Sequence, residues 1–252
     1  IRFSTHFSTR KQERFIAEAV ATAFLDHPNI VPIYDLGKDE FGEMMISMKL
    51  VKGLTWKALL RPKTQEEKQK AQKYSLKNHL EILITVCNAI AFAHSKNIVH
   101  NDLKPENIII GEFGAILVMD WGIAIDIQDD PPRDLPVPKK KSVRRPMGTP
   151  NYLAPELALG KGFSIGPWTD VYLLGAILYE LITNKPPHKA PNIQESLAIA
   201  IENKISPLPE DVPEELAEIC LQALSKNPKK RHPSVLAFQQ SLQDFLEHRE
   251  SL

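Results

Sequence analysis

The sequence predicts an α+β fold: a small N-terminal part containing two strands, joined near residues 49–54 to a larger, mainly helical part. Two strand-like runs, "VPIYDLG" and "EMMISMKLV", come early and are separated by "KDEFGE", which suits a hairpin turn. Helical patterns dominate from residue 78 onward. The chain has 252 residues, 43% of them hydrophobic, which is enough to bury a substantial core. We therefore expect a small α+β lobe joined to a larger, mainly α-helical lobe.

The N-terminal part is predicted to begin with a helix over residues 10–25, with Phe15, Val20 and Phe24 among its apolar positions. "HPNIV" ends this helix, because the residue before Pro28 is pushed away from helical angles. The two strands follow. Residues 61–77 are rich in Lys, Gln and Glu, and are expected to form a solvated loop or an exposed helix.

The C-terminal part is expected to contain several helices and one short strand pair. "NHLEILITVCNAIAFAHSKN" has an apolar face at helical spacing, and "NIIIGEFGAILVMDWG" indicates two short strands around a glycine turn. Residues 126–147 are Pro-rich and then basic, which indicates a long mobile loop. "WTDVYLLGAILYELIT" is apolar nearly all round and is expected to be a buried helix. Two further helices are predicted near 213–225 and 234–247.

Composition restricts the class of protein. The chain has 31 Lys plus Arg and 31 Asp plus Glu, so its net charge is zero, which argues against a nucleic-acid-binding protein. Cys87 and Cys220 both lie in apolar helical patterns, so we expect buried free thiols in a reducing compartment. The sequence has no apolar run of membrane-spanning length and no signal-peptide pattern.

The segment "HNDLKPEN" and the Asp that follows it carry the residue types needed for phosphoryl transfer. The Asp102 carboxylate can orient a hydroxyl or accept its proton, and Lys104 can neutralise charge on a transferred phosphoryl group. Asn107 offers a hard oxygen ligand for Mg²⁺. Asp120, at the end of an apolar strand, can provide a second metal contact. Phosphoryl transfer depends on such positioning and electrostatics.

Five segments, in order along the chain, resemble the motifs of protein kinases. "HNDLKPEN" resembles the catalytic loop, "DWG" resembles D-F-G, and "GTPNYLAPE" resembles the segment ending in A-P-E. "TDVYLLG" resembles the start of the central helix, and "NPKKRHPS" resembles the late Arg motif. The chain is identified as similar to eukaryotic-like (Hanks-type) bacterial serine/threonine protein kinase catalytic domains. The resemblance implies a two-lobed kinase fold with a mainly α-helical C-terminal lobe.

The resemblance implies a catalytic role for each matching residue of the loop. Asp102 would be the base or hydroxyl-orienting group, and Lys104 would contact the γ-phosphate. Asn107 and Asp120 would bind Mg²⁺, and Thr149 would help to position the substrate hydroxyl. His100, by contrast, is expected to be a packed structural residue.

The resemblance also implies nucleotide-binding and structural residues. Glu18 would pair with an ATP-contacting Lys. The nucleotide pocket and the hinge beside it would be formed by Met48, Lys49, Leu50 and Val51. Glu156 and Arg231 would form a buried ion pair, and Asp170 would anchor the backbone of the catalytic loop.

Two departures from the family pattern change these expectations. Asn101 stands where many kinases have an Arg that grips a phosphate on the activation loop. We therefore expect activity to depend little on phosphorylation of that loop, in which Ser142 is the expected acceptor. No Gly-rich loop and no strand bearing the ATP-contacting Lys precede Glu18. We expect these elements to have been truncated, which leaves a partial N-terminal lobe (1–48), a hinge (49–54) and a C-terminal lobe (55–252).

The expected activity is transfer of the ATP γ-phosphoryl group, with Mg²⁺, to Ser or Thr hydroxyls of a protein substrate. The alternative is a pseudokinase, a binding or scaffold module without transfer activity. A small-molecule kinase is disfavoured, because "GTPNYLAPE" resembles a platform for peptide substrates. The expected location is the cytoplasm, or the cytoplasmic side of a membrane-tethered parent protein. An uncovered N-lobe edge strand invites self-association.

Overall fold

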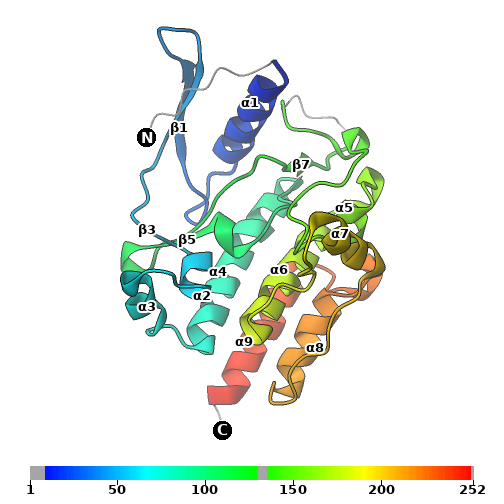
Figure 1. Cartoon of the computed structure of the whole chain (residues 1–252). Helices are drawn as coiled ribbons and strands as arrows, with labels where there is room; N and C mark the ends of the chain where they lie inside the picture. Colours follow the sequence, from blue (N-terminus) through cyan, green and yellow to red (C-terminus); the bar gives the residue numbers. More distant parts are fainter. Residues whose placement is uncertain (1–8, 130–134, 251–252) are drawn as a thin grey trace.

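In the computed structural model, the residues described are 9–129 and 135–250. They form a small upper lobe of one helix and two strands above a larger helical lobe (Figure 1). Residues 1–8 of the expected small lobe, residues 130–134 of the expected loop and residues 251–252 lie outside the described residues. The predicted α+β class is therefore confirmed, with its strands concentrated in the upper half of the molecule.

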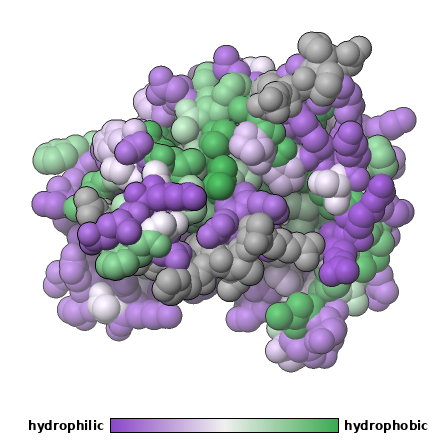
Figure 2. All heavy atoms as spheres, turned by 90° about the horizontal axis from the view of Figure 1, so that it is seen from above, coloured by the Kyte–Doolittle hydropathy of each residue, from purple (hydrophilic) through white to green (hydrophobic). Residues whose placement is uncertain are grey.

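The small lobe consists of helix α1 (Thr9–Phe24) packed against a two-stranded antiparallel sheet, β1 (Ile33–Lys38) and β2 (Met44–Met48). The turn between the strands is closed by Asp39, whose Oδ1 accepts hydrogen bonds from the backbone N–H groups of Phe41 and Glu43, both at 2.9 Å. The predicted hairpin is confirmed. Figure 2 looks down on this end of the molecule and shows hydrophobic side chains gathered near the middle of a largely hydrophilic face.

The connection between the lobes is short. Lys49 N donates to Pro32 O at 3.1 Å, and strand β3 (Gly53–Thr55) already pairs with β5 (Ile108–Gly111) of the large lobe. A Cβ on Gly53 would lie 2.3 Å from Ile110 O, so this close pairing requires glycine. The linker expected at residues 49–54 therefore overlaps β3 by two residues.

The large lobe is built around α6 (Pro167–Thr183), which is buried along most of its length, as predicted. It contacts α4 (Leu76–Ser95), α8 (Glu214–Ala223) and α9 (Val235–Glu250), as Figure 1 shows. Helices α6 and α8 approach closely at Gly175, where a Cβ would lie 2.6 Å from the Cβ of Ala223. Helix α3 (Gln65–Ala71), which has no buried residue, is the exposed helix that was one of the two expectations for residues 61–77. Three helices that the sequence pattern left unspecified complete the described set: α2 (Trp56–Leu60), α5 (Pro155–Ala158) and α7 (Ile193–Glu202).

Short strands and 3₁₀ turns carry the motif segments. Strand β5 follows the turn η1 (Pro105–Asn107) and pairs with β6 (Ile116–Val118), and η2 (Glu112–Gly114) lies between them. Strand β4 (Ile98–Val99) pairs with β7 (Ile125–Asp126). The remaining turns are η3 (Lys140–Ser142), η4 (Gly162–Ser164) and η5 (Pro228–Lys230). The segments before and after "HNDLKPEN" are therefore fixed by strands.

The described part of the 126–147 segment makes more contacts with the large lobe than its composition indicates. Val137 and Val143 are buried, and the Lys139 Nζ lies 2.6 Å from the buried Asp126 Oδ2. Asp126 and Lys139 also form a parallel backbone bridge. Residues 135–147 are mostly irregular, as expected for a loop. The two buried valines, together with the Asp126–Lys139 contact, attach residues 135–147 to the large lobe.

Cys87 and Cys220 are buried free thiols, which confirms the expectation from their helical patterns. Burial raises the pKa of both thiols, so the neutral form is favoured. Among the described helices, none combines the length and the apolarity needed to cross a bilayer.

Candidate active site

The loop that carries Asp102 is held in place by helix α6. The carboxylate of Asp170, which is fully buried, accepts hydrogen bonds from the backbone N–H groups of His100 and Asn101, both at 2.9 Å. His94 Nε2 lies 2.8 Å from the same carboxylate. Asn101 has a φ of 66°, a left-handed conformation that Asn tolerates better than most residues. The backbone at positions 100 and 101 is thus fixed before any ligand binds.

The His100 side chain is fully buried and packed. Its Nδ1 accepts from the backbone N–H of Asp102 at 3.2 Å, and its Nε2 lies 3.1 Å from Met119 O. Its ring lies 4.5 Å from the ring of Trp121, measured between centroids. His100 therefore connects the catalytic loop to the "DWG" segment and has the structural character that the sequence predicts.

The Asn101 side chain is also turned into the protein. Its Nδ2 donates to Val99 O and Ile123 O, each at 3.2 Å, and the residue has no exposed surface. These bonds connect the loop to the segment that follows "DWG". Asn101 therefore has a structural place, and its amide does not reach the surface where a phosphate on residues 135–147 would lie.

The Asp102 carboxylate is surrounded by donors from its own chain. Lys104 Nζ lies 2.5 Å from Oδ2, while Thr149 donates to Oδ1 through its hydroxyl at 2.7 Å and its backbone N–H at 2.9 Å. The Thr149 hydroxyl is in turn 2.7 Å from Lys104 Nζ. Gly148, with a φ of +101°, allows this approach, because a Cβ there would lie 3.0 Å from Asn101 O. The site therefore holds a hydroxyl between a carboxylate and an ammonium group.

Asn107 and Asp120 are brought together by backbone pairing. Asn107 O accepts from Met119 N at 2.9 Å, and Asn107 Nδ2 donates to Asp102 O at 2.9 Å. This leaves Asn107 Oδ1 without a hydrogen-bond donor among the described residues. The Asp120 side chain is exposed, and its φ of 61° turns the chain sharply at this point. An amide oxygen and an exposed carboxylate suit Mg²⁺, which is commonly held by one or two carboxylates together with phosphate oxygens.

Glu18 of α1 lies beside Asp120. A Cβ on Gly122 would be 3.1 Å from Glu18 Oε2 and 3.2 Å from Asp120 Oδ1, so both carboxylates border the same glycine. Burial, and then the charge of Asp120, raise the pKa of Glu18 to about 7. Among the described side chains, none forms an ion pair with Glu18.

A cavity of about 170 Å³ lies where the lobes meet. Its lining residues are mostly apolar: Val31, Met48, Lys49, Leu50, Val51, Ile109 and Met119. The four residues predicted from the sequence line this cavity, and the structure adds three aliphatic side chains. Two of these three could have been found from neighbouring motifs, since Ile109 follows "PEN" by two residues and Met119 precedes Asp120. A cavity of about 230 Å³ beside Lys70 and Tyr74 is larger, but no motif residue lines it.

Glu156 and Arg231 form a buried ion pair in the large lobe. Arg231 Nη1 and Nη2 lie 2.7 and 2.9 Å from the two carboxylate oxygens of Glu156. Thr169 donates to Glu156 Oε1 at 3.0 Å, and the Arg231 guanidinium lies 4.8 Å from the centre of the Tyr172 ring. This pair joins the segment after Thr149 to the C-terminal helices.

Comparison with known proteins agrees with this arrangement. The protein kinase domain family matches residues 3–245. Serine/threonine-protein kinase PknD of Protochlamydia amoebophila is 36% identical over 256 residues, which cover 94% of this chain and 26% of that protein. The proteins of the same name from Chlamydia trachomatis serovar D and Chlamydia abortus are 34% and 33% identical, each over 94% of this chain.

The chain spans about a quarter of the length of these curated relatives. The match to the family nevertheless covers nearly all of the chain, and it includes each of the motif segments. The resemblance inferred from the motifs is therefore confirmed. The chain belongs to the protein kinase domain family.

Proposed function

We propose that this chain is the catalytic part of a serine/threonine protein kinase that transfers the γ-phosphoryl group of ATP to Ser or Thr hydroxyls of a protein. A single observation carries the proposal. The hydroxyl of Thr149 lies 2.7 Å from Asp102 Oδ1 and 2.7 Å from Lys104 Nζ. The site thus already holds a hydroxyl between an acceptor for its proton and a positive charge, which is the arrangement an attacking hydroxyl needs.

In this proposal Asp102 orients the substrate hydroxyl and accepts its proton, and Lys104 stabilises negative charge on the transferred group. Thr149 holds Asp102 in position through its backbone N–H while its hydroxyl gives way to that of the substrate. Asp170 and His100 keep the loop in place. Asp102 is only partly exposed, with 12% of its side chain accessible, so water competes weakly for its oxygens.

Nucleotide binding is proposed for the cavity between the lobes. Met48, Lys49, Leu50 and Val51 would contact the base, with aliphatic side chains on the opposite side. Asn107 and Asp120 would hold Mg²⁺, which neutralises phosphate charge when bound. Glu18 would accept a cationic partner beside Asp120. The proposed domain division is a small lobe to residue 48, a linker and a large lobe, with the linker ending where β3 begins.

Protein substrates follow from the proposed activity, because the 148–156 segment next to Asp102 offers a platform for an extended peptide. The cytoplasm is the proposed location, since the reaction consumes ATP and the chain has two free thiols.

A pseudokinase remains the second candidate, and one observation favours it. Glu18 faces Asp120 with no cation among the described residues, and repulsion between two carboxylates disfavours binding of a polyphosphate nearby. A binding module with this fold would retain the Glu156–Arg231 pair but would have no need for the hydroxyl site at Asp102.

The two candidates differ in whether label from ATP reaches a protein. The full-length protein is incubated with γ-labelled ATP, Mg²⁺ and a generic protein substrate, followed by analysis of the phosphorylated amino acids. A parallel reaction contains a chelator. We expect Mg²⁺-dependent label on Ser and Thr. Nucleotide binding without any transfer would identify the pseudokinase instead.

A further inference from the structure

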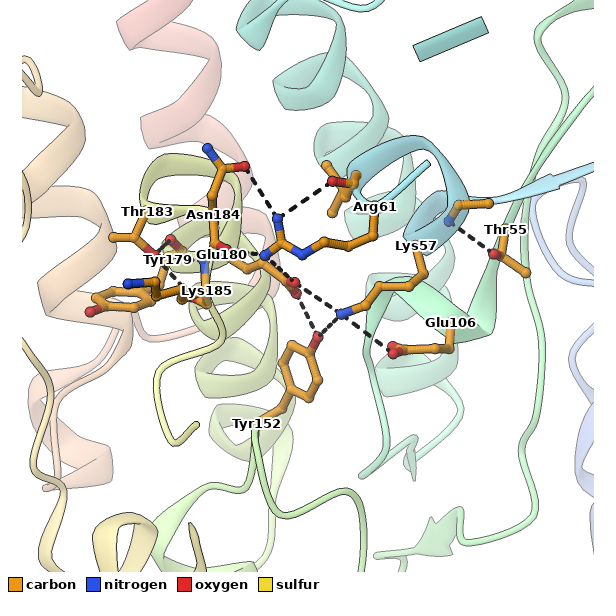
Figure 3. Close-up of polar contacts among 12 residues, drawn as sticks. Thr55, Lys57, Arg61, Glu106, Tyr152, Tyr179, Glu180, Thr183, Asn184 and Lys185 are labelled. Carbon is orange, nitrogen blue, oxygen red and sulfur yellow. Dashed lines mark hydrogen bonds and ion pairs between the residues drawn. The ribbon is translucent and has the colours of Figure 1, made fainter. Parts of the chain in front are cut away.

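A second polar cluster lies beside the catalytic loop, centred on Lys57 of helix α2 (Figure 3). Lys57 Nζ lies 2.9 Å from Glu180 Oε1, 3.2 Å from the Tyr152 hydroxyl and 3.5 Å from Glu106 Oε1. The Tyr152 hydroxyl donates to Glu180 Oε2 at 2.5 Å, and Arg61 Nη2 lies 3.2 Å from Glu180 Oε1. The single ammonium group of Lys57 therefore joins three groups from distant parts of the chain.

Lys57 is fixed in this position by its own helix. The Thr55 hydroxyl caps α2 by accepting from Ala58 N at 3.2 Å. Trp56, next to Lys57, is fully buried, and its Nε1 donates to His79 Nδ1 at 3.0 Å. The side chain of Lys57 itself is 28% exposed. A rigid helix thus holds a cation at the edge of the protein.

The cluster adjoins the proposed hydroxyl site on two sides. Glu106 lies between Lys104 and Asn107 in the same turn of chain. Tyr152 N donates to Thr149 O at 3.0 Å, and Thr149 contacts Asp102. Glu106 is 43% exposed, so its carboxylate borders the surface over which a peptide bound at Asp102 would run.

Without Lys57, this edge of the site would carry a net negative charge. Glu180 has a fully buried side chain, and a buried carboxylate needs a positive partner. Arg61 reaches Glu180, but it has no ion pair with Glu106 among the described residues. With Lys57 and Arg61 present, the two cations balance the two carboxylates. The ammonium group of Lys57 therefore occupies the position between Glu106 and Glu180 at which a basic side chain of a substrate would bind.

We propose that Lys57 determines substrate specificity: its ammonium group occupies the acidic position beside the acceptor site, so basic residues near the phosphorylated residue give a peptide no advantage. This inference rests on the proposed kinase function. Its consequence is specific. Removing the charge of Lys57 while keeping its aliphatic stem should create a preference for Arg at one position close to the acceptor.

The experiment uses peptides with a single Thr, in which each of the four residues on either side is in turn Arg or Gln. The full chain and Lys57→Met are compared by kcat/KM for each Arg and Gln pair. For the wild type we expect ratios within about threefold at every position. For Lys57→Met we expect one position at which Arg is favoured by about tenfold or more, the usual strength of a charged hydrogen bond.

Three controls separate this role from a general loss of charge. Arg61→Met also removes a cation from Glu180, yet it should leave the ratios within about threefold. Lys57→Arg should behave as the wild type. Adding Glu106→Gln to Lys57→Met should abolish the new preference. An unchanged ratio in Lys57→Met, or an equal rise in Arg61→Met, would overturn the proposal.

Two further measurements keep the test decisive. Glu106→Gln alone should not alter the Arg preference of the wild type. A tenfold wild-type preference for Arg that Glu106→Gln removes would contradict the proposal even if Lys57→Met failed to fold. Affinities of fluorescent peptides, measured without ATP, test the same preference independently of transfer. If Lys57→Met binds Arg-containing peptides selectively but no phosphate is transferred, the proposed kinase activity is refuted. The role of Lys57 in peptide specificity is then still supported.

Discussion

Glu156 and Glu18 are both shielded glutamates in this molecule, and their surroundings are opposite. Glu156 is 5% exposed, and its two oxygens meet Arg231 at 2.7 and 2.9 Å. Glu18 faces the carboxylate of Asp120 and has no ion-pair partner among the described residues. The first belongs to a completed structural element. The second favours a positive charge that the described residues do not supply, which suits a position beside a site for metal ions.

The comparison also separates structural anions from anions available for function. A fully paired carboxylate is costly to disturb and has no capacity left for a ligand. Repulsion between two neighbouring carboxylates raises the free energy of the folded protein, and binding of a cation between them removes this cost. The predictions below test this contrast, beginning with the largest expected effect.

Glu156→Ala should reduce the free energy of unfolding by about 3–5 kcal/mol, because it leaves the buried Arg231 without its counter-charge. The measurement is a denaturant titration. Glu215→Ala is the matched control: Glu215 is 44% exposed and, among the described residues, has an ion pair only with the exposed His248, so its removal should cost less than about 0.5 kcal/mol. A Glu156→Ala midpoint equal to that of the wild type would show that the pair does not hold the lobe together.

Glu18→Gln should change the pH dependence of stability. The pKa of Glu18 is about 7 in the folded protein, above its ordinary value of 4.5, so between these values the folded state keeps a proton that the unfolded chain has lost. Stability therefore falls as pH rises from about 4.5 to 7. Glu18→Gln should remove this decline and stabilise the protein above pH 7, on the order of 2 kcal/mol.

Denaturant midpoints measured from pH 5 to pH 8, without added Mg²⁺, test this prediction. Glu13→Gln, an exposed position in the same helix, serves as the control and should follow the wild type. Parallel curves for Glu18→Gln and the wild type would mean that a cation already neutralises Glu18. Glu18 would then be a paired carboxylate like Glu156, and the two sites would not differ.

Lys139→Met tests an intermediate case. Asp126 has a fully buried side chain like Glu156, but its partner Lys139 is 23% exposed, and Gln128 N also donates to the carboxylate at 2.8 Å. We expect a loss of about 1–2 kcal/mol, together with faster hydrogen exchange in residues 135–147. Lys140→Met, which removes a pair with the exposed Asp129, is the control and should cost less than about 1 kcal/mol. Equal losses in the two variants would show that burial of Asp126 is unimportant.

Ser142→Ala should have the smallest effect. Ser142 is exposed, and its hydroxyl donates to Lys139 O at 2.7 Å. The Asn101 side chain is buried and donates to Val99 O and Ile123 O. Asn101 therefore offers no charged partner to a phosphate on Ser142. We expect turnover within about tenfold of the wild type, equivalent to about 1.4 kcal/mol in the barrier. A larger drop, in this variant or after phosphatase treatment of the wild type, would show that the segment controls the site.

The helices and the hairpin could be predicted because their signals are local. Periodic apolar residues define α4 and α6, and a turn-forming run separates β1 from β2. The short helices α2 and α5 were missed for the opposite reason. Helix α2 has five residues, too few for a periodic pattern, and its position depends on the buried Trp56.

The candidate site shows the same division. Asp102, Lys104 and Asn107 lie in one short segment, so their proximity could be inferred from the chain itself. The link from Lys57 to Glu180 spans 123 positions and could not. The anchoring of residues 135–147 was also hidden, because it depends on Asp126 being buried by the rest of the fold. Long-range pairing of charges requires the three-dimensional structure.

The central claim is that Asp102 acts on a substrate hydroxyl in a working phosphoryl-transfer site. The most direct measurement is the single-turnover rate of phosphate transfer to a protein substrate by the wild type and by Asp102→Asn, with nucleotide affinity measured in parallel. The account predicts a loss of roughly 10² to 10⁴ in rate for Asp102→Asn, with nucleotide affinity little changed. Equal incorporation of phosphate by the two proteins would contradict it.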